Sequence, residues 1–145
     1  MVAVRNIDMM KLRAELKQDE GCVLHAYQDS LGYWTIGTGV LIDERKGGGI
    51  SQYEADFLLD NRLQKLLGNL DSAMPWILGM SDARQRALCN MSFQLGVNGL
   101  KNFKKMLQCM RIGNFDEAAK ECLNSNYAKQ TPERAQRVAK LIREG

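Results

Sequence analysis

Hydrophobic positions recur with two different spacings along the chain. Residues 22–42 alternate apolar and polar side chains, are rich in β-branched and aromatic types, and carry turn-forming residues at 29–32. Residues 51–70 instead place apolar side chains three or four positions apart: Ala55, Leu58, Leu59, Leu63, Leu66, Leu67 and Leu70. We therefore expect a small antiparallel sheet of two or three strands in the first stretch and a long helix in the second.

Helical spacing also occurs before the sheet and throughout the second half. An amphipathic helix over 7–20 is expected to end at Gly21. After a short turn or helix that begins at 74–76, further helices are expected at 81–95, ended by Gly96, and then at 99–112, 115–124 and 132–143. The second half is therefore predicted to be an all-helical bundle.

Four residues mark where helices should begin. Ser51 and Glu54 have the spacing of a capping box. Ser81 and Asn114 are suited to cap the helices that follow them, and Pro132 stands at the first position of the last helix.

Composition narrows the class of protein. The 145 residues suit one domain or two small lobes, and 45% hydrophobic with 26% charged residues is typical of a soluble globular protein. The first 21 residues are too charged for a signal peptide or a membrane span. If the protein acts outside the membrane, we expect another factor to let it across.

The formal net charge of +3 is unevenly distributed. Residues 101–145 carry ten basic and five acidic side chains. This excess suits an anionic partner such as a nucleic acid, an anionic membrane or a bacterial wall. A solvated helix face explains most of these charges equally well.

The cysteines do not suggest a metal site or a nucleophile. Cys22, Cys89, Cys109 and Cys122 are widely spaced, and His25 is the single histidine. We expect four reduced, mostly buried thiols. A Cys22–His25 pair would lie on opposite faces of a strand. With no nucleotide or flavin motif either, no cofactor and no metal are expected.

Residues 18–41 hold the candidate chemistry. Glu20 stands where the first helix should end, Asp29 lies beside a turn, and Thr35 follows inside a strand. Two carboxyl groups, one protonated and one ionised, are the minimum for glycoside hydrolysis. Taken singly, each residue is more simply a surface carboxylate, a turn former or a β-former. The hypothesis rests on their combination.

The same residues resemble a known family. Glu20-Gly21 followed by residues 26–39, AYQDSLGYWTIGTG, is similar to the active-site signature of the T-even phage lysozymes and related endolysins, E-G-x-x-L-x-x-Y-x-D-x-x-G-x-x-T-I-G-x-G. Residues 90–96, 115–119 and 130–137 match later landmarks of that family. The resemblance therefore covers nearly the whole chain.

The resemblance implies an α+β, mainly α fold with two lobes and a single domain over 1–145. Residues 16–60 would form the sheet lobe, residues 1–15 and 70–145 the helical lobe, and 51–70 the linking helix. The first helix would pack back on the helical lobe.

The resemblance also implies roles for single residues. Glu20 would be the general acid, and Asp29 with Thr35 would hold the attacking water, so that hydrolysis inverts the sugar. Leu41 and Phe93 match positions that line the sugar-binding cleft, although core packing explains them equally well. Arg134 and Gln94 would support the site.

Two ion pairs between the first and last helices are expected from the same resemblance. One joins Arg134 to Glu20, and the other brings Arg137 near Asp19. These pairs would tie the two helices together.

The chain departs from the family pattern in three places. Val40 stands where many relatives have histidine, and the loop around 47–49 is shorter. Cleft residues on two C-terminal helices, near Met106 and Glu121, are not kept. Details of glycan binding there are therefore not carried over.

The predicted function is a muramidase that cleaves the β-1,4 bond between N-acetylmuramic acid and N-acetylglucosamine, with peptidoglycan as its partner. We expect a monomer without nucleic acid or stable membrane insertion. It would be held in the host cytoplasm until a holin opens the membrane, or carried on a phage tail. The alternatives are a lytic transglycosylase and a non-catalytic wall- or nucleic-acid-binding module.

Overall fold

The protein is described by a computed structural model that covers residues 8–43 and 49–145. Its chain divides into two compact units, a first unit that ends at Phe57 and a second, helical unit over Leu58–Gly145. Within the described residues there are seven α-helices, one 3-10 helix and one three-stranded sheet. The predicted α+β, mainly α class is confirmed.

Helix α1, Met9–Glu20, opens the described part of the first unit. Asp8 caps it, because its Oδ1 accepts hydrogen bonds from the backbone N–H groups of Met10 and Lys11 at 3.1 Å. The helix ends as predicted at Gly21, whose φ of +72° favours glycine. The expected start at Ile7 lies outside the described residues.

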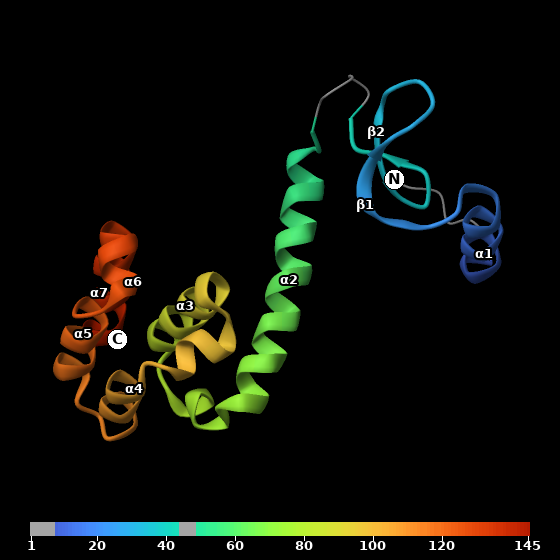
Figure 1. Ribbon diagram of the computed structural model, residues 1–145. Coiled ribbons are helices and arrows are strands. Elements are labelled where there is room, and N and C mark those ends of the chain that lie inside the picture. Colours follow the sequence, from blue (N-terminus) through green and yellow to red (C-terminus); the bar gives the residue numbers. More distant parts are fainter. Residues whose placement is uncertain (1–7, 44–48) are drawn as a thin grey trace. The chain divides into compact units, whose positions relative to one another are not determined.

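The sheet consists of β1, Val23–Gln28, β2, Trp34–Gly37, and β3, Val40–Leu41 (Figure 1). The strands are antiparallel in the order β1-β2-β3. Thr35 on the middle strand pairs with Tyr27 on one side and Leu41 on the other. The predicted small sheet is therefore confirmed, with three strands.

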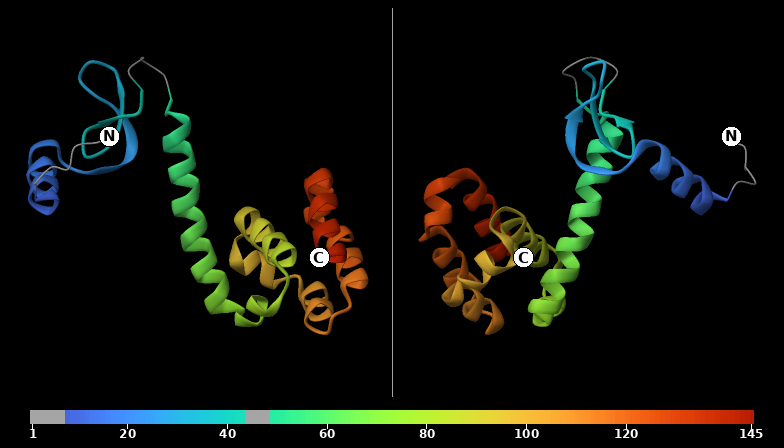
Figure 2. Two further views of the ribbon diagram at one scale, coloured as in Figure 1. Left: turned by 180° about the vertical axis from the view of Figure 1, so that it is seen from behind. Right: turned by 45° about the vertical axis from the view of Figure 1, so that its right-hand side comes forward.

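Helix α2, Gln52–Ala73, is one continuous helix (Figure 2). The predicted capping box at its start is confirmed, since the Ser51 and Glu54 side chains each accept the other's backbone N–H. The helix extends three residues beyond the predicted end. The division between the two units falls within it, after Phe57. Of the expected glycine loop, residues 46–48 lie outside the described residues.

The helical unit continues with η1, Pro75–Gly79, and α3, Asp82–Lys101. Its remaining helices are α4, Lys104–Arg111, α5, Phe115–Leu123, α6, Asn126–Gln130, and α7, Pro132–Glu144. Helix α7 packs on both α3 and α5. The core is drawn from all of these helices, and its largest fully buried side chains include Leu88, Met91, Leu100, Met110 and Ile142.

Two helix boundaries in this unit differ from the prediction. Gly96, with φ +77° and ψ +163°, ends the first part of α3 as expected, but the chain resumes a helical path up to Lys101. The predicted helix over 99–112 is therefore divided between the end of α3 and α4. Helix α6, a five-residue helix capped by Ser125, was not predicted from the sequence.

Arg84 on α3 joins the end of the chain to the bundle. Its guanidinium donates to the carbonyls of Ile142 at 2.8 Å and Arg143 at 3.2 Å, and lies 3.3 Å from the centre of the Phe115 ring. Both carbonyls belong to the last turn of α7, where carbonyl groups find no N–H partner within the helix itself.

Within the described residues, no helix is both long and apolar enough to cross a membrane.

Candidate active site

Glu20 lies at the junction between α1 and the sheet. It is the last residue of α1, its side chain is exposed, and its carboxyl group lies against the turn between β2 and β3. A Cβ atom at Gly39 would stand 2.7 Å from Glu20 Oε2 and 2.9 Å from its Cδ. The carboxyl group therefore occupies space that is open because residue 39 has no side chain.

Asp29 lies directly after β1 and is fixed by the turn that follows. Its Oδ1 accepts the backbone N–H groups of Leu31 and Tyr33, both at 2.9 Å. Its own N–H donates to the Tyr33 carbonyl, and its carbonyl accepts from Gly32. Both bonds to the carboxylate fall on one oxygen, so the group is held in one orientation.

Thr35 connects to Asp29 through the backbone of Tyr33. The Thr35 hydroxyl donates to the Tyr33 carbonyl at 3.2 Å, the same carbonyl that accepts from the Asp29 N–H. Thr35 is buried, with 4% of its surface exposed. Because the hydroxyl uses its proton in this bond, its lone pairs remain as acceptors.

This arrangement brings one exposed carboxyl group, one oriented carboxylate and one hydroxyl into the same small unit. Two carboxyl groups in different surroundings are what acid-assisted hydrolysis of a glycosidic bond requires. No group of three or more His, Cys, Asp or Glu side chains that could hold a metal occurs within residues 8–43 and 49–145.

Comparison with protein families matches residues 17–143 to the family described as phage lysozyme. A probable T4-type lysozyme of Dictyostelium discoideum is 32% identical over 90% of this chain and 92% of its own length. The chain belongs to the phage lysozyme family. This confirms the predicted resemblance and the predicted class of enzyme, a glycoside hydrolase.

Two phage proteins are also similar to this chain. The pre-baseplate central spike protein Gp5 of Enterobacteria phage T4 is 32% identical over 94% of this chain, which corresponds to 28% of the spike protein. An endolysin of Acyrthosiphon pisum secondary endosymbiont phage 1 is 25% identical over 79% of this chain and 76% of its own length. The region similar to this chain therefore makes up most of the endolysin and about a quarter of the spike protein.

The two predicted sugar-contacting residues of the lysozyme are both exposed. Leu41 lies on β3 with 46% of its surface exposed, next to Thr35. Phe93 lies on α3 with 49% exposed, and lines a cavity of about 250 Å³ together with Leu59 and Leu63. Neither side chain belongs to the buried core of the described residues, and the sugar-binding role of both stays a prediction.

The two predicted supporting residues both connect α3 to the C-terminal segment. Arg134 donates to the Asn90 side chain at 2.7 Å and to its carbonyl at 3.1 Å. Gln94 donates to the Thr131 hydroxyl at 3.3 Å. The expected pairs of Arg134 with Glu20 and of Arg137 with Asp19 would join residues of the two units, and both stay predictions.

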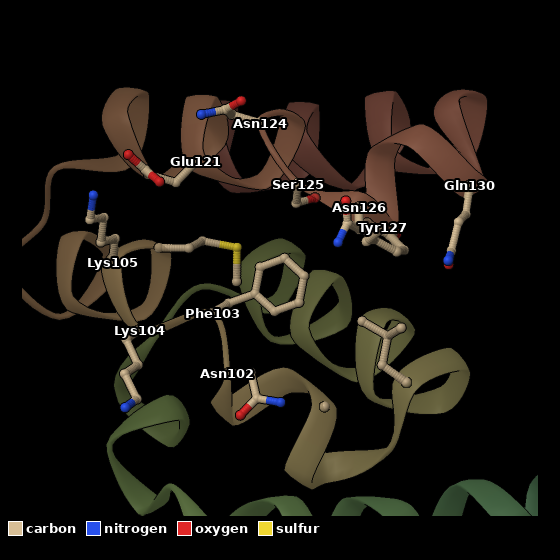
Figure 3. Close-up of a pocket in the computed structure, with 13 residues that line it drawn as sticks. Asn102, Phe103, Lys104, Lys105, Glu121, Asn124, Ser125, Asn126, Tyr127 and Gln130 are labelled. Carbon is tan, nitrogen blue, oxygen red and sulfur yellow. The ribbon is translucent and has the colours of Figure 1, made fainter.

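The helical unit of the lysozyme contains a second, larger cavity of about 620 Å³ (Figure 3). Asn102, Phe103 and Lys104 border it on one side, and Glu121 and Tyr127 on the other. The rings of Phe103 and Tyr127 meet edge to face, with centres 6.2 Å apart. This cavity includes Met106 and Glu121, where the chain departs from the family pattern.

Sequence reasoning missed two features of the site. The first is the contact between Gly39 and Glu20. Gly39 was recognised as part of the motif, but its place beside the Glu20 carboxyl group was not predicted. The second is the Tyr33 backbone, which carries bonds to both Asp29 and Thr35. The Glu20–Gly39 contact joins positions far apart in the chain, so no local pattern signals it.

Proposed function

We propose that this phage lysozyme hydrolyses the β-1,4 bond between N-acetylmuramic acid and N-acetylglucosamine in peptidoglycan, with inversion at the sugar. The observation that carries the proposal is the pair of differently held carboxyl groups, Glu20 free beside Gly39 and Asp29 fixed by two backbone N–H groups. Membership of the lysozyme family supports peptidoglycan as the substrate.

Glu20 acts as the general acid in this proposal. A proton on its carboxyl group passes to the glycosidic oxygen as the bond to the leaving sugar breaks. Its exposed position at the end of α1 leaves the carboxyl group accessible to a substrate. No hydrogen bond within the described residues engages its side chain.

Asp29 and Thr35 act together on the attacking water. Asp29 Oδ1 is occupied by two N–H donors, which leaves Oδ2 to accept a proton from water. The Thr35 hydroxyl, turned toward the Tyr33 carbonyl, offers lone pairs to the second proton of the same water. The water then attacks the face of the sugar opposite the leaving group, and inversion follows.

A lytic transglycosylase and a non-catalytic wall-binding module are the competing functions. A transglycosylase needs one acid/base carboxyl group and no activated water, so the second, oriented carboxylate argues against it. A binding module needs neither carboxyl group. Formation of 1,6-anhydromuramic ends would identify the transglycosylase, and release of no new ends would identify the binding module.

We propose host cell lysis as the biological role, with the enzyme made in the host cytoplasm as a monomer and reaching the wall once a holin opens the membrane. The similarity to an endolysin supports this role. The similarity to a pre-baseplate central spike protein keeps a tail-associated role as the alternative. Deleting the coding sequence from the phage separates them, because loss of an endolysin delays lysis whereas loss of a tail lysozyme impairs entry.

The experiment that tests the proposed chemistry substitutes Glu20 by glutamine. Glu20→Gln removes the transferable proton and should lower turnover of peptidoglycan by about 10³-fold or more. Glu15→Gln changes another exposed carboxyl group of α1 by the same atoms and should leave turnover unchanged. Near-normal turnover of a folded Glu20→Gln variant would refute the assignment of the acid.

A further inference from the structure

Gly39 lies beside the carboxyl group of Glu20. It lies in the turn between β2 and β3 with a φ of +63°. A Cβ there would stand within 3.0 Å of three Glu20 side-chain atoms, Oε2, Cδ and Cγ. Real Cβ atoms essentially never come so close, so a side chain at residue 39 requires a shift, and the end of the exposed Glu20 side chain is the group that can move most easily.

Gly37, the last residue of β2, provides a comparison two positions before Gly39. Its φ of +67° is nearly the same as that of Gly39, yet a Cβ at Gly37 would meet no atom within 4 Å. The two glycines therefore share the same need for a left-handed backbone. They differ in whether their missing side chain makes room for Glu20.

We propose that Gly39 is a positioning residue that sets the place of the Glu20 carboxyl group through the absence of its own side chain. The inference rests on the proposed role of Glu20 as the acid. If the carboxyl group moves by about 1 Å, the reaction rate can fall by about 10²-fold, because proton transfer depends on the distance from the carboxyl group to the glycosidic oxygen. Gly39 itself does not touch the reacting atoms.

The test compares Gly39→Ala with Gly37→Ala in the full chain. Both variants should lose stability, because alanine is strained at this φ, and Gly39→Ala should lose somewhat more, because its methyl group also meets the Glu20 side chain. Gly39→Ala should lower kcat by about 10² while KM stays within about twofold, since the acid and not substrate binding is disturbed. Gly37→Ala should keep kcat within about threefold. Equal kcat values for the two variants would overturn the proposal.

A double-variant cycle gives a second measurement that does not depend on activity. If the alanine methyl group strikes the Glu20 side chain, then Gly39→Ala should lower Tm less in a Glu20→Ala background than in the native protein. Equal losses of Tm in both backgrounds would overturn the proposal, even if the single variant folds poorly.

Failure of the inference and failure of the proposed function give different results. If the Tm cycle shows coupling but Glu20→Gln keeps its turnover, Gly39 positions a carboxyl group that is not the acid. If Glu20→Gln is inactive and the cycle shows no coupling, Glu20 is the acid but Gly39 does not position it.

Discussion

Each of the two units of this lysozyme is stabilised internally by different interactions. All buried hydrophobic side chains within the described residues come from Leu70 onward, in the helical unit. In the described part of the first unit, Thr35 is the one buried side chain. In the first unit, hydrogen bonds within a turn orient the Asp29 carboxylate, and glycines of positive φ, such as Gly39, shape the turns of the backbone.

This difference indicates which residues should set the reaction rate and which should set the free energy of unfolding. A carboxylate held by two backbone N–H groups keeps its orientation without a core around it. A helix in the bundle keeps its place through burial of apolar side chains, which is the larger contribution to folding free energy. Substitutions of the oriented polar side chains in the first unit should therefore change the rate, and substitutions of buried apolar side chains in the helical unit should change the free energy of unfolding.

The largest expected effect is on the rate, at Asp29. Asp29→Asn keeps an oxygen that can accept from Leu31 and Tyr33, but it removes the base that takes the proton from water. We expect turnover to fall by about 10³-fold, with Tm changed by only a few degrees. Single-turnover hydrolysis of a purified glycan measures the rate. A loss of Tm as large as that of a core variant would break the separation between the units.

The next largest effect is on stability, at Leu88. This side chain is fully buried in the core, and Leu88→Ala should lower the free energy of unfolding by about 3 kcal/mol or more, because it leaves a cavity. Leu24→Ala on β1, where 88% of the side chain is exposed, should change it by less than about 0.5 kcal/mol. Urea unfolding compares the two variants. Equal losses would mean that β1 is supported by packing after all.

Many of the helix boundaries were predictable from the sequence, because they follow from local patterns. Ser81, Asn114 and Pro132 start helices where the sequence predicted, and Gly21 ends one, since a cap acts on its own helix turn. The division of the predicted 99–112 helix was not predictable, because that window holds apolar side chains at helical spacing on both sides of the break.

Contacts between residues far apart in the chain could not be predicted from the sequence. Arg134 was expected to pair with a carboxylate, but within the helical unit it binds the side chain and carbonyl of Asn90. The stacking of Arg84 on Phe115 was also missed, because nothing in either segment distinguishes this arginine from one on a solvated face. Such contacts depend on the packing of helices and not on any spacing along the chain.

A smaller effect is expected at Arg84. Arg84→Gln removes the stacking on Phe115 and the bonds to two carbonyls of the last turn of α7, and should lower the free energy of unfolding by about 1–2 kcal/mol. Arg86→Gln is the matched control. Arg86 pairs with Asp82 on the solvent-exposed surface, and such pairs contribute about 0–1 kcal/mol. If the two variants lose the same stability, Arg84 does not join α7 to the bundle.

The smallest effect concerns the reactivity of the cysteines. Burial raises the pKa of the Cys122 thiol to about 11. At pH 8 only about one Cys122 in a thousand is then a thiolate, the form that reacts. We expect a thiol reagent to label exposed Cys22 quickly and Cys122 slowly, with Cys122 labelling increasing as the pH approaches 11. A Cys22→Ser variant should lack the fast phase. Rapid labelling of Cys122 at pH 8 would mean that the bundle opens readily.

In the proposed mechanism, water held by Asp29 and Thr35 attacks the sugar on the face opposite the leaving group. Proton NMR of the first-formed reducing end tests this directly, when it is recorded before the anomers equilibrate. A β-linked glycan cleaved with inversion should give the α anomer first. Initial formation of the β anomer would contradict the proposed roles of Asp29 and Thr35 and would instead indicate a covalent intermediate.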